Sequence, residues 1–321
     1  MKIRTNNNWE LSNAPFFTII TPIYNRRQTL SRTIKSVETQ TFTDFEYILI
    51  DDGSQDTCDD IILDFMNKTN IPVMYIKKKN GGVHTARNIG YEHSRGKLII
   101  CIDSDDELLP EACKVFFDEW NSIPIDKQSS YWQMKALCID ERGIVISDEF
   151  PKDINSKSRK EAVEFFSKSK GEQLGCRVST ILKNRKFPEP QKVTFVDENV
   201  LWTQLEQEYN SWAVNTPVRV YHTEGDNHLT NQRKKSIQSC YNALWNSAYA
   251  INNKERMLSS KIAYVKMIMR YGIMKAILSS IDKSFCLENR LIHSSDRCIY
   301  YLLYIFTIPG GHIYKKKRMI L

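Results

Sequence analysis

The chain of 321 residues has no closely paired cysteines and no glycine-rich phosphate loop. Its eight cysteines are scattered without a C-x-x-C pair, and several fall inside apolar runs. We therefore expect reduced core thiols in a cytosolic protein, and neither disulfides nor a zinc site. No G-x-G-x-x-G follows an apolar run that could form a strand, which argues against a nicotinamide-dependent dehydrogenase.

The sequence also lacks an apolar run long enough to cross a bilayer. The nearest, residues 298–308, covers roughly half of the required span and is followed by a basic cluster at 315–318. A basic start that leads into polar asparagines predicts no signal peptide, and so a cytoplasmic protein. An aromatic, apolar segment beside a basic cluster is typical of peripheral contact with the inner face of the cell membrane. A terminal helix packed on the core, with a solvated basic tail, is the alternative.

No nucleic-acid-binding signature accompanies the formal net charge of +7. The positive charge sharpens only at residues 77–79, 233–235 and 315–318, outside any RNA-binding or helix-turn-helix pattern. We therefore expect no nucleic acid partner. A hydrophobic content of 41% is ordinary for a globular protein, and the length is sufficient for a full core.

Up to about residue 125, apolar runs alternate with segments of helical periodicity. The predicted strands are 16–21, 46–50, 73–76 and 98–102. The predicted helices are 28–40, 60–66, 85–93 and 110–120. This alternation predicts an α/β fold in which helices flank a Rossmann-like, mainly parallel sheet with right-handed crossovers.

Beyond residue 125 the pattern becomes less regular. Strands are predicted at 131–139, 143–147, 178–182 and 218–222. Helices are predicted at 160–168, 195–209, 243–251 and 262–277. We expect three segments, at 1–125, 126–230 and 231–321, the last being a mostly helical C-terminal extension.

Three carboxylates follow the fourth predicted strand. The run 98–102 has no polar alternation, which is typical of a strand buried on both faces, and it ends in Asp103, Asp105 and Asp106. Ligands collect at the carboxyl ends of such strands. Asp103 and Asp105 could bind a hard divalent cation, which could in turn hold the phosphates of a nucleotide. Alternatively, these acids cap the next helix or face solvent.

The other strand ends carry residues suited to a nucleotide. After the first strand, Pro22 fixes the turn and Tyr24 offers an aromatic surface. After the second, Gly53 permits a sharp exit beside Asp51 and Asp52, one of which can accept a base N–H, although Asp-Gly-Ser is also a common turn before a helix.

After the third strand, Gly81 and Gly82 let the backbone approach a ligand closely. Arg87 can pair with a phosphate or with an acid of the loop after the fourth strand.

Four motifs in this order resemble the family 2 glycosyltransferases, which have the GT-A fold. They are Pro-Ile-Tyr-Asn at 22–25, Ile-Asp-Asp-Gly-Ser at 50–54, Asn-Gly-Gly at 80–82 with Ala-Arg-Asn at 86–88, and Asp-Ser-Asp-Asp at 103–106. A nucleotidyltransferase is an alternative enzyme, but it would normally place a glycine-rich phosphate loop at 22–26.

The resemblance implies a role for each motif. Tyr24 and Asp52 would contact the nucleobase and Asp51 would support that pocket. Asp103 and Asp105 would form the D-x-D motif of the family, with Asp105 the direct ligand of Mn²⁺ or Mg²⁺. The expected nucleotide-sugar-binding residues are Pro22, Tyr24, Asn25, Asp51, Asp52, Gly81, Gly82, Arg87, Asp103, Ser104 and Asp106.

The family also takes its catalytic base from an acidic pair at the start of a later helix, for which Asp197 and Glu198 are the candidates. The resemblance favours Glu198, because its spacing to Trp202 puts both on one helix face. The reversed acid order leaves the choice open, and both acids could merely suit the positive end of the helix dipole. His222 is a further candidate for the metal or the pyrophosphate, or a structural histidine.

By this resemblance the chain is an inverting, metal-dependent glycosyltransferase. The expected donor is a UDP-sugar, and the acceptor is a hydroxyl of a glycan or lipid-linked glycan in surface polysaccharide synthesis. Residues 1–125 would bind the nucleotide sugar and 126–230 the acceptor. The Q-x-x-R-W pattern of processive synthases is missing. A non-catalytic binding module for a nucleotide sugar or a membrane surface is the alternative outside the enzymes.

Overall fold

The computed structural model describes the whole chain except residues 12, 224–235, 254–260 and 304–321, and the side chains of Lys261 and Ala263. The chain forms two compact units. The first unit comprises 1–186 and 208–224, and the second comprises 187–207 and 225–321. Residues 187–207 thus group with the C-terminal helices, whereas the sequence placed them in the middle segment.

The first unit is built on a nine-stranded sheet in the order β1-β4-β3-β2-β5-β8-β7-β9-β6. The strands are β1 (Lys2–Thr5), β2 (Phe17–Ile23), β3 (Phe45–Asp51), β4 (Val73–Lys77), β5 (Leu98–Cys101), β6 (Glu107–Leu108), β7 (Tyr131–Ile139), β8 (Gln173–Val178) and β9 (Asn210–Val220). Strands β4, β3, β2 and β5 are parallel neighbours, as predicted. The order reverses between β2 and β5, the position at which open α/β sheets bind ligands.

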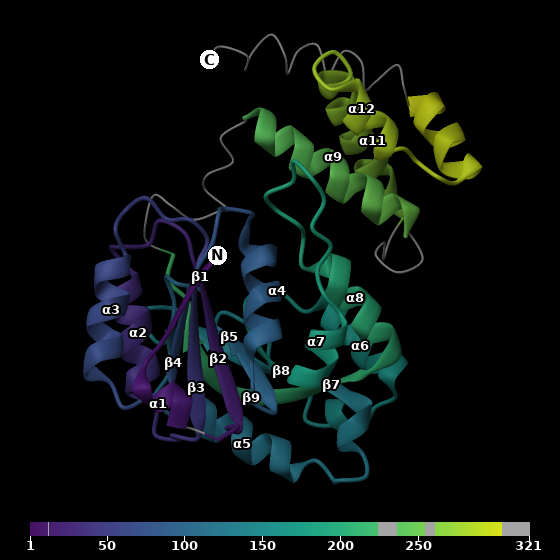
Figure 1. Cartoon of the computed structure of the whole chain (residues 1–321). Helices are drawn as coiled ribbons and strands as arrows, with labels where there is room; N and C mark the ends of the chain where they lie inside the picture. The colour runs from purple at the N-terminus through teal and green to yellow at the C-terminus, as the bar shows by residue number, and fades with distance from the viewer. Residues whose placement is uncertain (12, 224–235, 254–260, 304–321) are drawn as a thin grey trace. The chain divides into compact units, whose positions relative to one another are not determined.

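Helices cover both faces of the parallel part of the sheet, with α2 and α3 on one side and α4 on the other (Figure 1). The helices of this unit are α1 (Asn7–Leu11), α2 (Leu30–Glu38), α3 (Asp59–Lys68), α4 (Val83–His93), α5 (Ala112–Ser122), α6 (Arg159–Lys168) and α7 (Ser179–Asn184), with short 3-10 turns at Gln128–Ser130 and Ile154–Ser156. Because helices screen both faces, every residue of β2 and β3 is buried.

Three local predictions were wrong. The β-branched run 178–182 is not a strand: β8 ends at Val178, and α7 begins where the Ser179 N–H donates to the carbonyl of Lys97. Residues 143–147 do not form a strand; Val145 only forms an isolated β-bridge with Ile139. Pro22 does not shape a turn, because it lies buried inside β2.

The second unit is helical. Its helices are α8 (Asn199–Glu208, whose last residue groups with the first unit), α9 (Ile237–Asn252), α11 (Lys261–Leu278) and α12 (Lys283–Glu288), and residues 294–303 are also helical. Within the described residues, no helix is both long and apolar enough to span a bilayer. All eight cysteines lie among the described residues; none forms a disulfide and seven are buried.

Candidate active site

The acid loop, residues 103–106, follows the carboxyl end of β5. It lies at the switch point of the sheet, the position between β2 and β5 where the strand order reverses. Its three carboxylates differ in access to solvent. The side chain of Asp103 is 45% exposed, that of Asp105 14%, and that of Asp106 2%. Asp103 and Asp105 are therefore the acids that a ligand can reach, while Asp106 belongs to the interior.

Side chains from α2 and the turn before it hold the backbone of the acid loop. Thr29, Arg32 and Thr33 donate to the carbonyls of residues 104, 105 and 106, at 2.8, 2.6 and 2.8 Å. Positions i, i+3 and i+4 share one helix face, so a single face fixes three successive peptides. These residues were not predicted, because nothing in the sequence marks them except their helical spacing.

Two arginines pair with the accessible acids. Arg26 Nη2 lies 3.2 Å from Oδ2 of Asp105, and Arg87 Nη2 lies 3.3 Å from Oδ1 of Asp103. All but Asp103 are largely buried, so solvent screens these pairs less than surface pairs. Of the two partners predicted for Arg87, a phosphate or an acid of this loop, the structure shows the acid, and the pairing of Arg26 was not predicted.

Asp106 is held by the end of β9. Arg219 Nη1 lies 3.3 Å from its Oδ2, and the main-chain N–H of His222 donates to its Oδ1 at 3.0 Å. Burial raises the pKa of Asp106 to about 7, and the positive charge of Arg219 opposes that rise. Asp106 therefore ties the acid loop to the far half of the sheet.

The ring of His222 lies between two carboxylates. Its Nε2 is 2.7 Å from Oε1 of Glu107, and its Nδ1 is 3.4 Å from Oε1 of Glu141. A ring nitrogen that ligates a metal would have to leave one of these acids. The metal role of His222 stays a prediction.

Asp52 organises the glycine loop, which contains Gly81 and Gly82. Its Oδ2 accepts the N–H of Gly82 at 2.7 Å, and its Oδ1 accepts the N–H of Gly81 at 2.9 Å and an ion pair from Lys78. Gly82 has a φ of +94°, which a residue with a Cβ would adopt only under strain. Asp52 thus joins the loop after β3 to the loop after β4.

Asp51 is fully buried and supports the same turn. Its Oδ1 accepts the N–H of Ser54 at 2.7 Å, and its Oδ2 accepts the hydroxyl of Tyr75 at 3.2 Å. Asn25 joins this turn to the first loop, since its N–H donates to Ser54 at 3.0 Å and its side chain accepts from Gln55 at 2.9 Å.

Tyr24 is 46% exposed, which leaves this residue accessible for stacking. The nucleobase contact expected of Tyr24 stays a prediction.

The acidic pair lies in the second unit, at the start of α8. Asp197 accepts the N–H of Asn199 at 2.9 Å, in a capping role. Glu198 accepts the indole N–H of Trp202 at 2.9 Å, which confirms that the two share a helix face. The choice of base stays a prediction.

The chemistry of the acid loop suits a divalent cation. Among the described residues, no group of three or more His, Cys, Asp or Glu side chains is arranged to bind a metal ion by itself. Mg²⁺-type ions, however, are usually bound by one or two carboxylates plus substrate phosphates. Asp105 and Asp103, which are partly accessible and separated by one residue, fit that requirement.

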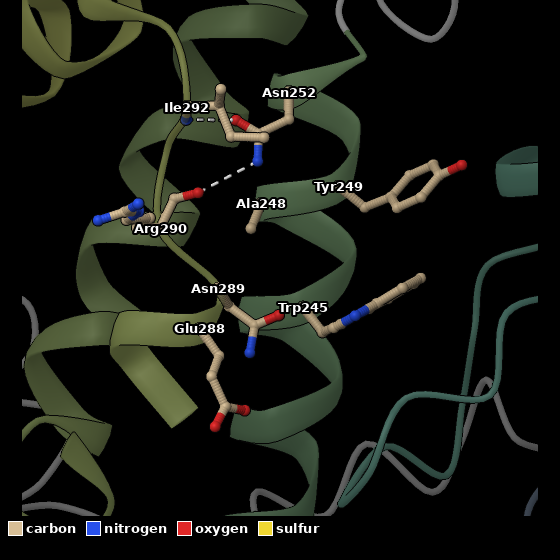
Figure 2. Close-up of a pocket in the computed structure, with 8 residues that line it drawn as sticks. All are labelled: Trp245, Ala248, Tyr249, Asn252, Glu288, Asn289, Arg290 and Ile292. Carbon is tan, nitrogen blue, oxygen red and sulfur yellow. Dashed lines mark hydrogen bonds between the residues drawn. The ribbon is translucent and has the colours of Figure 1, made fainter. Parts of the chain in front are cut away.

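The second unit contains a separate hollow of about 310 Å³ between α9 and residues 288–292. Figure 2 shows Asn252 at one end of the lining residues, where its side chain bonds the main chain of Arg290 and Ile292. Trp245 and Tyr249 stack at 5.1 Å on α9. None of the predicted site residues lines this hollow.

Comparisons with known proteins agree with this geometry. Residues 18–126 match the family model for glycosyl transferase family 2. The chain is 26% identical over 314 residues to the GalNAc(5)-diNAcBac-PP-undecaprenol beta-1,3-glucosyltransferase of Campylobacter jejuni. The aligned region covers 95% of this chain and 97% of that protein. The chain is 32% identical over 111 residues to the poly(ribitol-phosphate) beta-N-acetylglucosaminyltransferase TarS of Staphylococcus aureus, or 33% of this chain and 19% of TarS.

Solved structures share the fold. The structure of S. aureus TarS 1–349 in complex with UDP-GlcNAc matches with a TM-score of 0.57 and 14% identity, covering 94% of this chain and 90% of that chain. A mannosyltransferase from Pyrobaculum calidifontis, in complex with GDP-Man and Mn²⁺, matches with a TM-score of 0.52 and 12% identity, covering 94% and 87%.

The fold is the GT-A fold of these solved glycosyltransferases. Residues 18–126 form a glycosyl transferase family 2 domain, and the chain is an enzyme.

Proposed function

We propose that this enzyme transfers a sugar, with inversion, from a UDP-sugar to a hydroxyl of a lipid-linked glycan. The carrying observation is the acid loop, which places two accessible carboxylates at the switch point on a backbone fixed by α2. The TarS structure with UDP-GlcNAc and the undecaprenol-linked substrate named for the Campylobacter relative support the donor and acceptor classes. We assign donor binding to residues 1–125 and acceptor binding to residues 126–230.

Asp105 and Asp103 would hold Mn²⁺ or Mg²⁺. When bound, such an ion neutralises charge that develops on the departing diphosphate. Asp106 would position the donor sugar through the acid loop. Asp52 would serve the nucleotide pocket by fixing the glycine loop, and the exposed ring of Tyr24 would stack on the base.

Glu198 would act as general base, taking the proton from the acceptor hydroxyl as it attacks the anomeric carbon. Two contacts support this choice over Asp197. The bond from Trp202 orients the Glu198 carboxylate, whereas Asp197 is engaged in capping α8. Positioning the two substrates would supply much of the remaining rate.

We also propose that the enzyme works in the cytoplasm, at the inner face of the membrane. In the described part of the C-terminal segment, Tyr301 is 66% and Leu302 76% exposed, while residues 304–318 lie outside the described residues. Helix α11 has no acidic residue and exposes Ile262 beside Lys266. Apolar and basic side chains exposed together suit an anionic lipid surface.

A panel of nucleotide sugars tests the proposal. UDP-sugars should raise the unfolding temperature in the presence of Mn²⁺, and should do so more strongly than GDP-mannose. Transfer to a lipid-linked glycan should follow with the best donor. Stabilisation by GDP-mannose alone would refute the donor class, and loss of sugar to water without transfer would refute the acceptor class.

A further inference from the structure

Arg26 occupies a position that the proposed chemistry does not yet use. It follows Tyr24 and Asn25 directly after β2, its side chain is 15% exposed, and its guanidinium pairs with Asp105 at 3.2 Å. The next residue, Arg27, pairs instead with Asp60 at 3.0 Å, and its side chain is 45% exposed. Two adjacent arginines therefore have different surroundings, and only Arg26 contacts the acid loop through an ion pair of its side chain.

The pairing places a fixed positive charge where a cation would bind. A divalent ion on Asp105 would compete with the guanidinium of Arg26 for the same carboxylate, and the two positive charges would repel each other. That repulsion disappears when an anion lies between them. A nucleoside diphosphate supplies such an anion, and a guanidinium recognises phosphate through paired N–H donors.

We propose that Arg26 is a donor-binding residue that exchanges its partner. When the cation and the donor bind together, its guanidinium releases Asp105 and pairs with the diphosphate instead. This inference rests on the proposed function and adds a residue to it. Arg26 weakens binding of the cation alone and strengthens binding of the cation together with the diphosphate. The cation and the donor therefore bind cooperatively. Thermodynamic linkage requires that each then strengthens the other by the same factor.

Direct binding measurements on the full chain test this exchange. Free Mn²⁺ is titrated with and without UDP, and UMP serves as a ligand that lacks the second phosphate. In Arg26→Gln we expect Mn²⁺ alone to bind about tenfold more tightly, and UDP with Mn²⁺ about tenfold more weakly, which is the effect of one charge-assisted hydrogen bond. UMP affinity should change little.

Arg27→Gln is the matched control and should leave all three affinities at their wild-type values. If Arg26→Gln does not fold, Arg26→Lys decides, because it keeps the charge without the paired donors. It should retain wild-type Mn²⁺ affinity and lose part of the UDP affinity.

Opposite movement of the two affinities in Arg26→Gln supports the exchange. Unchanged affinities, or a fall in both, would overturn it while the transferase function stands. A wild-type enzyme that binds neither Mn²⁺ nor UDP would overturn the proposed function itself.

Discussion

Arg219 in β9 lies with its Nη1 3.3 Å from Oδ2 of Asp106, and both side chains are almost fully buried. The same guanidinium reaches Glu172 at 3.0 Å. The pair joins two segments far apart in the chain, the acid loop and β9, which ends at Val220. It is therefore a structural connection between the acid loop and the far half of the sheet.

Removal of Arg219 should destabilise the protein strongly. Arg219→Met leaves Asp106 buried without its counter-ion, and breaking such a pair costs about 3–5 kcal/mol. Urea unfolding measures this loss. The control is Arg142→Gln, which breaks the ion pair of an arginine that is 77% exposed and should cost far less. Equal losses in the two variants would contradict the role of Arg219.

The acidic pair can be resolved by two charge-neutral substitutions. Glu198→Gln should bind donor normally and transfer sugar about a hundredfold more slowly, the usual scale of a lost general base. Asp197→Asn should retain most activity, because an asparagine can still cap α8. The comparison of kcat in both variants decides. If Asp197→Asn is the impaired variant, Asp197 is the base.

The parallel half of the sheet could be predicted because its strands are short apolar runs that the helices bury on both sides. Of the later strands, β7 has its predicted bounds, but β8 was not predicted, and β9 begins at Asn210, before the predicted strand 218–222. The run 178–182 has the β-branched residues of a strand, yet Ser179 begins a helix through its bond to Lys97. A contact across 82 positions of sequence decided that boundary, and local propensity does not report it.

The candidate site divides in the same way. Asp103, Asp105 and Asp106 were predictable, because they follow a buried strand directly. Arg26 and Arg219 were not, since their partners lie 79 and 113 positions away in the sequence, and an arginine carries no local sign of the acid that it pairs with.

His84 should make stability depend on pH. It is buried, and in the described part of the chain neither ring nitrogen has a hydrogen-bond partner. Burial lowers its pKa to about 4, from 6.5 in the unfolded chain. Between these values the unfolded state binds more protons, so acidification removes up to about 3 kcal/mol of stability.

His84→Phe should remove that part of the acid sensitivity. The free energy of unfolding of the wild type, measured between pH 7 and pH 4, should fall more than that of the variant. His293→Gln changes an exposed histidine and should follow the wild-type curve. Identical pH profiles for the wild type and His84→Phe would contradict this account.

The bond from Thr33 to the carbonyl of Asp106 should stabilise the acid loop. Thr33→Val keeps the shape of the side chain and leaves a buried carbonyl without its donor, at a cost of about 1–3 kcal/mol. Chemical denaturation reports the loss. Thr39→Val removes the hydroxyl of an exposed threonine that bonds within its own helix, and it should cost far less. A loss in Thr33→Val no larger than that in Thr39→Val would show that the bond has little effect.

The most direct measurement is sugar transfer by Asp105→Ala, with its unfolding curve recorded beside that of the wild type. We expect turnover to fall by about a hundredfold or more, because the leaving diphosphate loses its cation, while the unfolding midpoint stays close to that of the wild type. Wild-type turnover in a folded Asp105→Ala enzyme would contradict the assignment of the acid loop as the donor site.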